Sequence, residues 1–137
     1  MGLFGKSKEE KIKESVILLR DLIKKVEDWR DKNIPEEKDE WLPRHLHHLK
    51  EFTDRLDYSL LTLLGVEQVY NDEGDQRLGA GGYDNGERIK RCLVGIKALI
   101  KFVKYCKEEP TSKITPPFPE TLLSQMLNDL YRIKKIL

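Results

Sequence analysis

Apolar residues recur at steps of three and four along most of this chain, which is the spacing that places them on one face of an α-helix. The first such stretch covers residues 7–31, and its apolar stripe consists of Ile12, Val16, Leu19, Ile23 and Val26. Ser7 and Glu10 have the spacing of a capping box, which satisfies free backbone N–H groups at a helix N-terminus. Asn33 and Pro35 predict the end of this helix.

Two further stretches carry the same spacing and predict a second and a fourth helix. The second helix begins near residues 39–40 and ends at Gly65, or at Tyr70 if the apolar spacing is followed further. Its stripe consists of Leu42, Leu46, Leu49, Phe52 or Thr53, Leu56, Leu60 and Leu63. The last helix covers residues 120–137, and its stripe consists of Leu123, Met126, Leu130, Ile133 and Leu137.

A third helix is predicted from about residue 85 to residue 107, and the pair Asp84 and Glu87 has the spacing of a second capping box. One narrow strip of this helix is basic and consists of Lys90, Lys97, Lys101 and Lys104. Most of the remaining circumference is apolar, so we expect the helix to lie in the middle of a bundle with only the lysine strip in water. Four prolines in 108–119 predict an extended connector, because proline has no N–H for helical hydrogen bonding.

Residues 71–86 contain five glycines among several Asp and Asn residues, which is typical of a loop. Gly79, Gly81 and Gly82 can adopt left-handed conformations and form an anion-binding nest just before the N-terminus of the third helix. No strand is predicted before the loop and no Gly-Lys-Ser/Thr sequence follows it, so it matches neither a dinucleotide fingerprint nor a Walker loop. The alternative is a plain flexible loop.

Four amphipathic helices without an alternating strand pattern predict an all-α protein, a four-helix bundle. The short link between the first two helices predicts antiparallel neighbours, and the long Gly-rich loop lies between helices 2 and 3. We expect residues 1–6 to form a flexible tail and residues 7–137 to form a single helical-bundle domain. A chain of 137 residues is long enough to bury a core of its own.

The formal net charge of +1 conceals a negative middle and a positive end of the chain. Residues 1–34 sum to +2, residues 35–90 to −6 and residues 91–137 to +5. The stretch from Arg88 to Lys107 has seven basic residues and no acidic residue.

This basic stretch has two interpretations. One is contact with a polyanion or an acidic partner through Lys90, Lys97, Lys101, Lys104, Arg88 and Arg91. The other is internal ion pairing with acids of the second helix, for which Glu51, Asp54 and Asp57 are the candidates. The lysines are not interleaved with exposed aromatic residues, so the pattern is a weak nucleic-acid signature.

The three histidines cluster at the start of the second helix, where His45 and His48 share a helix face with Glu51. These residue types bind metals, but zinc and di-iron sites need three or four converging ligands and no second cluster is present. Arg44 followed by His48 resembles the Arg–His motif of HEPN-type ribonucleases, with fewer residues between them than that motif has. The alternative is a set of partly exposed histidines without chemistry.

Cys92 and Cys106 fall on the apolar side of one helix, about 21 Å apart at a rise of 1.5 Å per residue. That separation excludes a disulfide between them, so we expect buried free thiols and a reducing compartment. No apolar run reaches the length of a membrane span, and the first residues do not resemble a secretory signal. We therefore expect a cytoplasmic protein, and the alternative is membrane attachment through residues 2–13.

The missing catalytic motifs and the segregated charge favour a non-enzymatic helical interaction or accessory protein. We expect its partner to be another protein or a second copy of the chain, and we expect no cofactor. Two alternatives remain, a nucleic-acid-binding accessory protein that uses the third helix and a metal-dependent or HEPN-like hydrolase that uses the histidine cluster.

Overall fold

Four helices account for most of the chain in the computed structural model, which describes residues 5–33, 43–70, 76–80 and 83–137. The helices are α1 (Lys8–Asn33), α2 (Pro43–Leu63), α3 (Asn85–Glu108) and α4 (Glu120–Ile136). Two short strands, β1 (Val66–Tyr70) and β2 (Gln76–Ala80), lie between α2 and α3. The predicted helical bundle is confirmed, with a small hairpin added to it.

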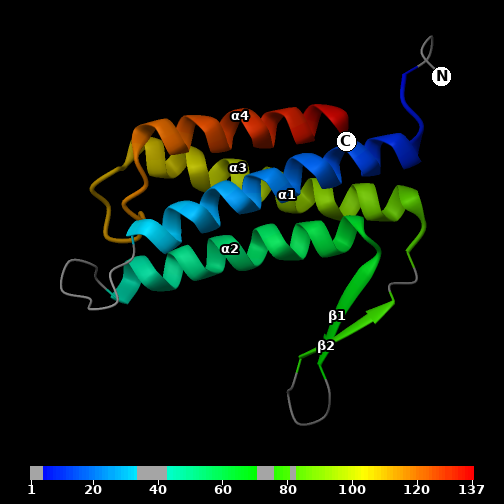
Figure 1. Cartoon of the computed structure of the whole chain (residues 1–137), viewed down its shortest axis with the longest axis horizontal. Helices are drawn as coiled ribbons and strands as arrows, with labels where there is room; N and C mark the ends of the chain where they lie inside the picture. The colour runs from blue at the N-terminus through cyan, green and yellow to red at the C-terminus, as the bar shows by residue number, and fades with distance from the viewer. Residues whose placement is uncertain (1–4, 34–42, 71–75, 81–82) are drawn as a thin grey trace.

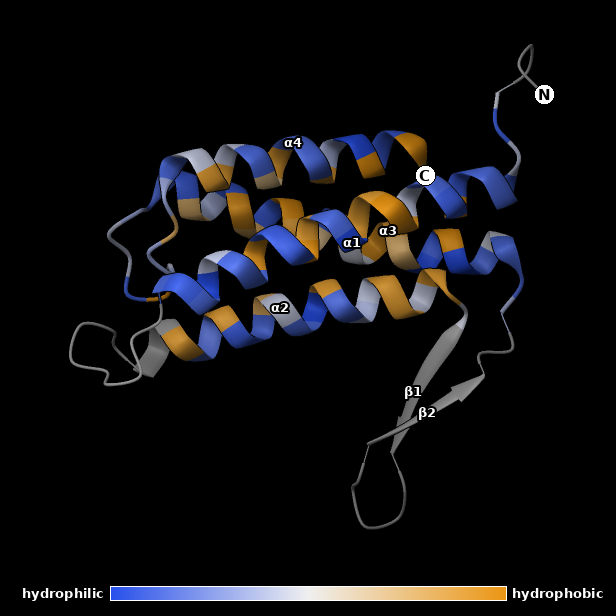
Figure 2. Ribbon diagram, viewed as in Figure 1, coloured by the Kyte–Doolittle hydropathy of each residue, from blue (hydrophilic) through white to orange (hydrophobic). Residues whose placement is uncertain are grey.

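The helices lie side by side along their lengths (Figure 1). Both α1 and α3 pack against α2 and α4, and α1 also contacts α3 across the core. The connector between α3 and α4 lies at one end of the bundle, and the hairpin lies at the other (Figure 1). Apolar residues gather on the sides of the helices that face one another (Figure 2).

The core is built from all four helices and from the connector before α4. Among its least exposed side chains are Leu19, Leu22, Phe52, Leu56, Ile96, Val103, Met126 and Leu130. On α3 the buried set is Cys92, Ile96, Leu99, Ile100, Val103 and Cys106. The prediction that only lysines of this helix reach water is wrong, because Val94 is 66% exposed and Ala98 is exposed as well.

Side chains cap the N-termini of α1 and α3, as predicted. The backbone N–H of Glu10 donates to Ser7 Oγ at 3.2 Å, just before α1. The backbone N–H of Glu87 donates to Asp84 Oδ1 at 2.8 Å, and Asp84 is the N-cap residue of α3. These bonds satisfy backbone donors that have no partner inside the helix.

The segment after α2 differs from the prediction. The helix ends at Leu63, and Gly65 adopts a φ of +75°, a left-handed conformation that turns the chain out of the helix. The alternative that extended α2 to Tyr70 is therefore wrong. The run from Val66 to Tyr70 instead pairs antiparallel with Gln76–Ala80, as suits a segment rich in β-branched and aromatic residues.

Part of the predicted glycine loop is thus strand. Gly79 lies in β2 opposite Glu67, whereas Gly81 and Gly82 lie outside the described residues, so the anion nest stays a prediction. The strands project from the bundle beyond the end of α2 (Figure 1).

Across the described ranges, none of the helices combines the length and the apolar character that crossing a bilayer requires.

Candidate functional site

One side of α3 is a row of exposed lysines, which we call the lysine face. Its members are Lys90, Lys97, Lys101 and Lys104, and each of them is exposed. Lys90, Lys97 and Lys104 follow one another at intervals of seven residues, or nearly two turns, so their side chains leave the same side of the helix. The row is about 21 Å long at 1.5 Å per residue.

The lysine face has no internal counter-charge within the part of the chain that the structure describes. No carboxylate there lies within 4.0 Å of any of its four ammonium groups. Of the acids considered as partners, Glu51 lies 3.7 Å from His47 Nε2 and 3.5 Å from His48 Nδ1 instead. Asp54 and Asp57 are exposed on α2 and lie beyond ion-pair distance of these lysines. The internal ion pairing with Glu51, Asp54 and Asp57 is therefore not found among the described residues.

The two arginines predicted to join this surface make local contacts at the start of α3. The Nε–H of Arg88 donates to the carbonyl oxygen of Tyr83 at 3.2 Å. The guanidinium also fills the space beside Gly65, where an added Cβ would lie 2.5 Å from it. Arg91 pairs with Glu87 at 2.9 Å and lies over the Tyr83 ring at 4.1 Å. We therefore separate both arginines from the lysine face.

A groove runs between α2 and α3, beside the lysine face. It consists of two adjoining hollows of about 200 and 400 Å³, which share Arg55 and Ala98. The first hollow is also lined by His48, Glu51, Phe52, Leu99, Phe102 and Ile114. The second is also lined by Asp54, Tyr58, Ser59, Val94 and Gly95. We call this feature the α2–α3 groove, and its walls are mainly apolar.

The floor of the α2–α3 groove is a close contact between the two helices. A Cβ added at Gly95 would lie 2.7 Å from Ser59 Oγ, closer than side-chain atoms can approach. Residue 95 therefore has no room for a side chain at this crossing, and Ser59 is buried against it. Val94 on α3 and Tyr58 on α2 flank this contact and reach solvent.

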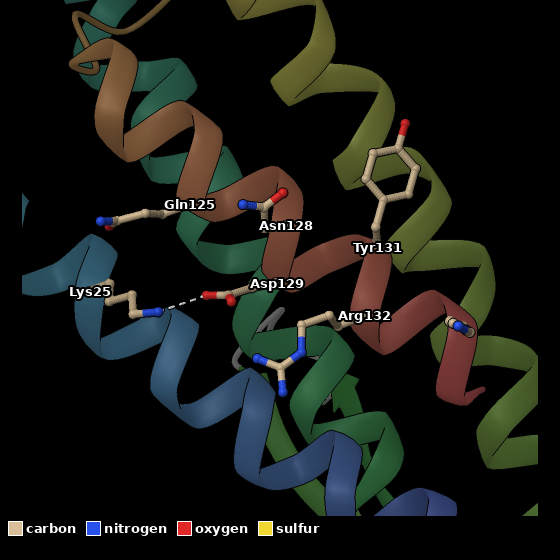
Figure 3. Close-up of a pocket in the computed structure, with 7 residues that line it drawn as sticks. Lys25, Gln125, Asn128, Asp129, Tyr131 and Arg132 are labelled. Atoms are coloured by element: carbon tan, nitrogen blue, oxygen red, sulfur yellow. Dashed lines mark hydrogen bonds and ion pairs between the residues drawn. The ribbon is translucent and has the colours of Figure 1, made fainter.

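A second, more open hollow of about 590 Å³ lies between α1 and α4, and Figure 3 shows the side chains that line it. Lys25 of α1 points toward Asp129 of α4, and their charged atoms lie 2.9 Å apart. The hydrogen bond that Lys25 donates to the Asp129 carboxylate raises the pKa of Lys25 above its ordinary value, although partial burial acts in the opposite direction. The Asp129 side chain is 11% exposed and the Lys25 side chain is 37% exposed, so this pair links the two helices at a contact that solvent partly reaches.

This link could not be predicted from the sequence, because the two residues are 104 positions apart. Neither residue belongs to a recognisable motif, and only the packing of α1 on α4 brings them together. We interpret the pair as a structural contact, because each charge already has its partner.

The structure describes the histidine cluster only in part. Within the described residues, no three His, Cys, Asp or Glu side chains converge as the ligands of a metal ion would. His47 and His48 contact each other edge to face and lie near Glu51. The side chain of His45 lies outside the described set, so its predicted role as a ligand stays a prediction.

No protein-family model, curated protein or solved structure matches this chain. A function can therefore be proposed only from the structure itself, and the lysine face and the α2–α3 groove are the two features that support one.

Proposed function

We propose that this protein is a non-enzymatic interaction module that binds an acidic partner protein through the lysine face of α3. The observation that supports this most strongly is the row of four exposed lysines without a carboxylate in ion-pair distance among the described residues. Like charges so close along a helix repel one another, which costs stability in the free protein. Carboxylates of a partner would remove that repulsion and speed the encounter.

The lysines alone give only a modest affinity. An exposed ion pair contributes about 0.2–1 kcal/mol, so four such pairs supply at most about 4 kcal/mol. Specific binding therefore needs apolar contact as well. The exposed side chains of Val94 and Tyr58 lie beside the lysine face and provide it.

A nucleic acid is the second candidate partner, because an unpaired row of cations also fits a phosphate backbone. Single-stranded binding sites usually add stacked aromatic rings, and the exposed apolar residue between Lys90 and Lys97 is the aliphatic Val94. Val94 can pack against an apolar side chain of a protein partner, whereas a phosphate backbone offers it no apolar contact. A protein partner therefore fits this surface better.

The double substitution Lys97→Glu with Lys101→Glu tests the proposal. We expect it to weaken binding of fluorescein-labelled poly-L-glutamate by about tenfold or more in low salt, because two attractions become repulsions, worth roughly 1.4 kcal/mol together. Fluorescence anisotropy measures the affinity, and raising the salt concentration should weaken the wild-type complex.

The matched control is Lys13→Glu with Lys24→Glu, which changes two exposed lysines of α1 and the net charge by the same amount. We expect this control to retain most of the binding. Equal losses in the two double variants would show that net charge alone is responsible, and the proposal would fail. Tighter binding of a labelled single-stranded oligonucleotide than of poly-L-glutamate would favour the nucleic-acid function instead.

A further inference from the structure

We infer that the partner contributes an acidic amphipathic helix, whose apolar side enters the α2–α3 groove while its carboxylates face the lysine face. This inference rests on the proposed function and specifies the kind of partner. Three features of the described residues support it, namely the distribution of exposed apolar side chains, the spacing of the lysines and the uneven charge of the two groove walls.

Exposed apolar side chains concentrate along the α2–α3 groove. Six large hydrophobic residues of the described chain are exposed, namely Ile17, Tyr58, Leu64, Val94, Ile114 and Tyr131. Three of them, Tyr58, Val94 and Ile114, line this one groove. Exposed apolar surface that is gathered in a groove and bordered by charge is typical of a protein-binding site.

The spacing of the lysines fits a helix better than an extended strand. Lys90, Lys97 and Lys104 are about 10.5 Å apart along α3, which is the rise of seven helical residues. A partner helix packed along α3 repeats its side chains at the same heptad interval. Side chains on one face of an extended strand recur about every 6.6 Å, so they would fall out of step with these lysines.

The two walls of the groove differ in charge. The α2 wall carries the acids Glu51 and Asp54 together with Arg55, whereas the α3 wall is uncharged. The lysine face lies on the same helix, outside the groove. The α2 wall has two acids against one base, so carboxylates of a partner helix are attracted more strongly to the four lysines of α3 than to α2. The electrostatics therefore fix how the helix is rotated, with its acidic side toward α3 and its apolar side on Val94 and Tyr58.

The experiment uses a designed peptide of about 21 residues, with glutamates at heptad spacing and leucines on the adjacent face. A scrambled peptide of the same composition has the same charge but no apolar side. We expect the wild-type protein to bind the amphipathic peptide about tenfold more tightly than the scrambled one, and the peptide to gain helical circular dichroism on binding.

The double variant Tyr58→Ser with Val94→Ser removes apolar surface without changing charge. We expect its preference between the two peptides to fall to within about twofold. Ile17→Ser, at an equally exposed position on α1, should keep the full preference. Both variants alter exposed side chains, and a thermal melt checks that they remain folded.

Failure of this inference can be distinguished from failure of the proposed function. If the scrambled peptide binds equally well, if the peptide binds without becoming helical, or if Tyr58→Ser with Val94→Ser keeps the preference, the helix-in-groove inference is wrong. Poly-L-glutamate binding that depends on Lys97 and Lys101 would still support the proposed function in each of these cases. Absence of binding to all three acidic probes would overturn both.

Discussion

Phe52→Ala is expected to lower the free energy of unfolding by about 3–5 kcal/mol, the usual cost of emptying an aromatic site in a core. Phe52 is 2% exposed on α2. Its ring centroid lies 5.4 Å from that of Phe102 on α3 and 5.8 Å from that of Phe118 in the connector before α4. Truncation would leave a cavity where three segments meet, and Trp29 of α1 also packs against Phe118, with ring centroids 5.0 Å apart.

Chemical denaturation followed by far-ultraviolet circular dichroism measures this loss. The matched control is Tyr58→Ala, which removes an aromatic ring from the same helix at a position that is 51% exposed. We expect the control to change stability by no more than about 0.5 kcal/mol. Similar losses in the two variants would contradict the assignment of Phe52 to the core and of Tyr58 to the surface.

The two cysteines are expected to react far more slowly with a thiol reagent in the folded protein than in the unfolded chain. Burial raises the pKa of Cys92 from 9.0 to about 12 and that of Cys106 to about 11. Only the thiolate reacts, so at pH 8 the smaller thiolate fraction slows labelling about a thousandfold at Cys92 and a hundredfold at Cys106. Both residues are also shielded, at 1% and 0% exposure.

Mass spectrometry after brief alkylation at pH 8, with and without denaturant, measures this protection. Rapid labelling of Cys92 in the native protein would show that α3 is not packed as described.

The same pKa shifts imply a pH dependence of stability. The raised values favour the folded state fully below pH 9, and this contribution is lost as the pH rises toward 11–12, because the thiols of the unfolded chain ionise first.

The helices could be predicted from the sequence because each of them carries a continuous apolar stripe. The stripe predicted for α1 was too narrow, however. Leu22 is fully buried, whereas the predicted Ile23 is only half-buried. The helix contacts α2, α4 and α3, so its buried face is broader than the seam of a two-helix contact.

The β-hairpin could not be separated from a loop or a helical extension by its sequence. Val66 and Val69 continue the three-residue spacing of α2, and the following glycines are typical of a loop. The deciding feature is the backbone of Gly65, whose positive φ ends the helical path before the valines. Many glycines end helices in this way, but the sequence alone does not show which glycine does so.

The candidate site was predicted in part. The lysine face follows from helical spacing alone, because it needs only the sequence of α3. The α2–α3 groove cannot be predicted from helical spacing, because the exposure of Val94 and Ala98 depends on where α2 and α4 cover α3. The contacts of Arg88 and Arg91 were missed for a similar reason, since they depend on how the chain before α3 folds back onto it.

The central claim is that the lysine face and the α2–α3 groove together form the binding surface. The most direct test is a titration of the isotope-labelled protein with the amphipathic acidic peptide, followed by backbone amide NMR shifts. We predict that the largest shifts fall on α3 from Lys90 to Lys104 and on the facing residues of α2. Shifts centred instead on Arg132 and Lys135, in the hollow between α1 and α4, would contradict the claim.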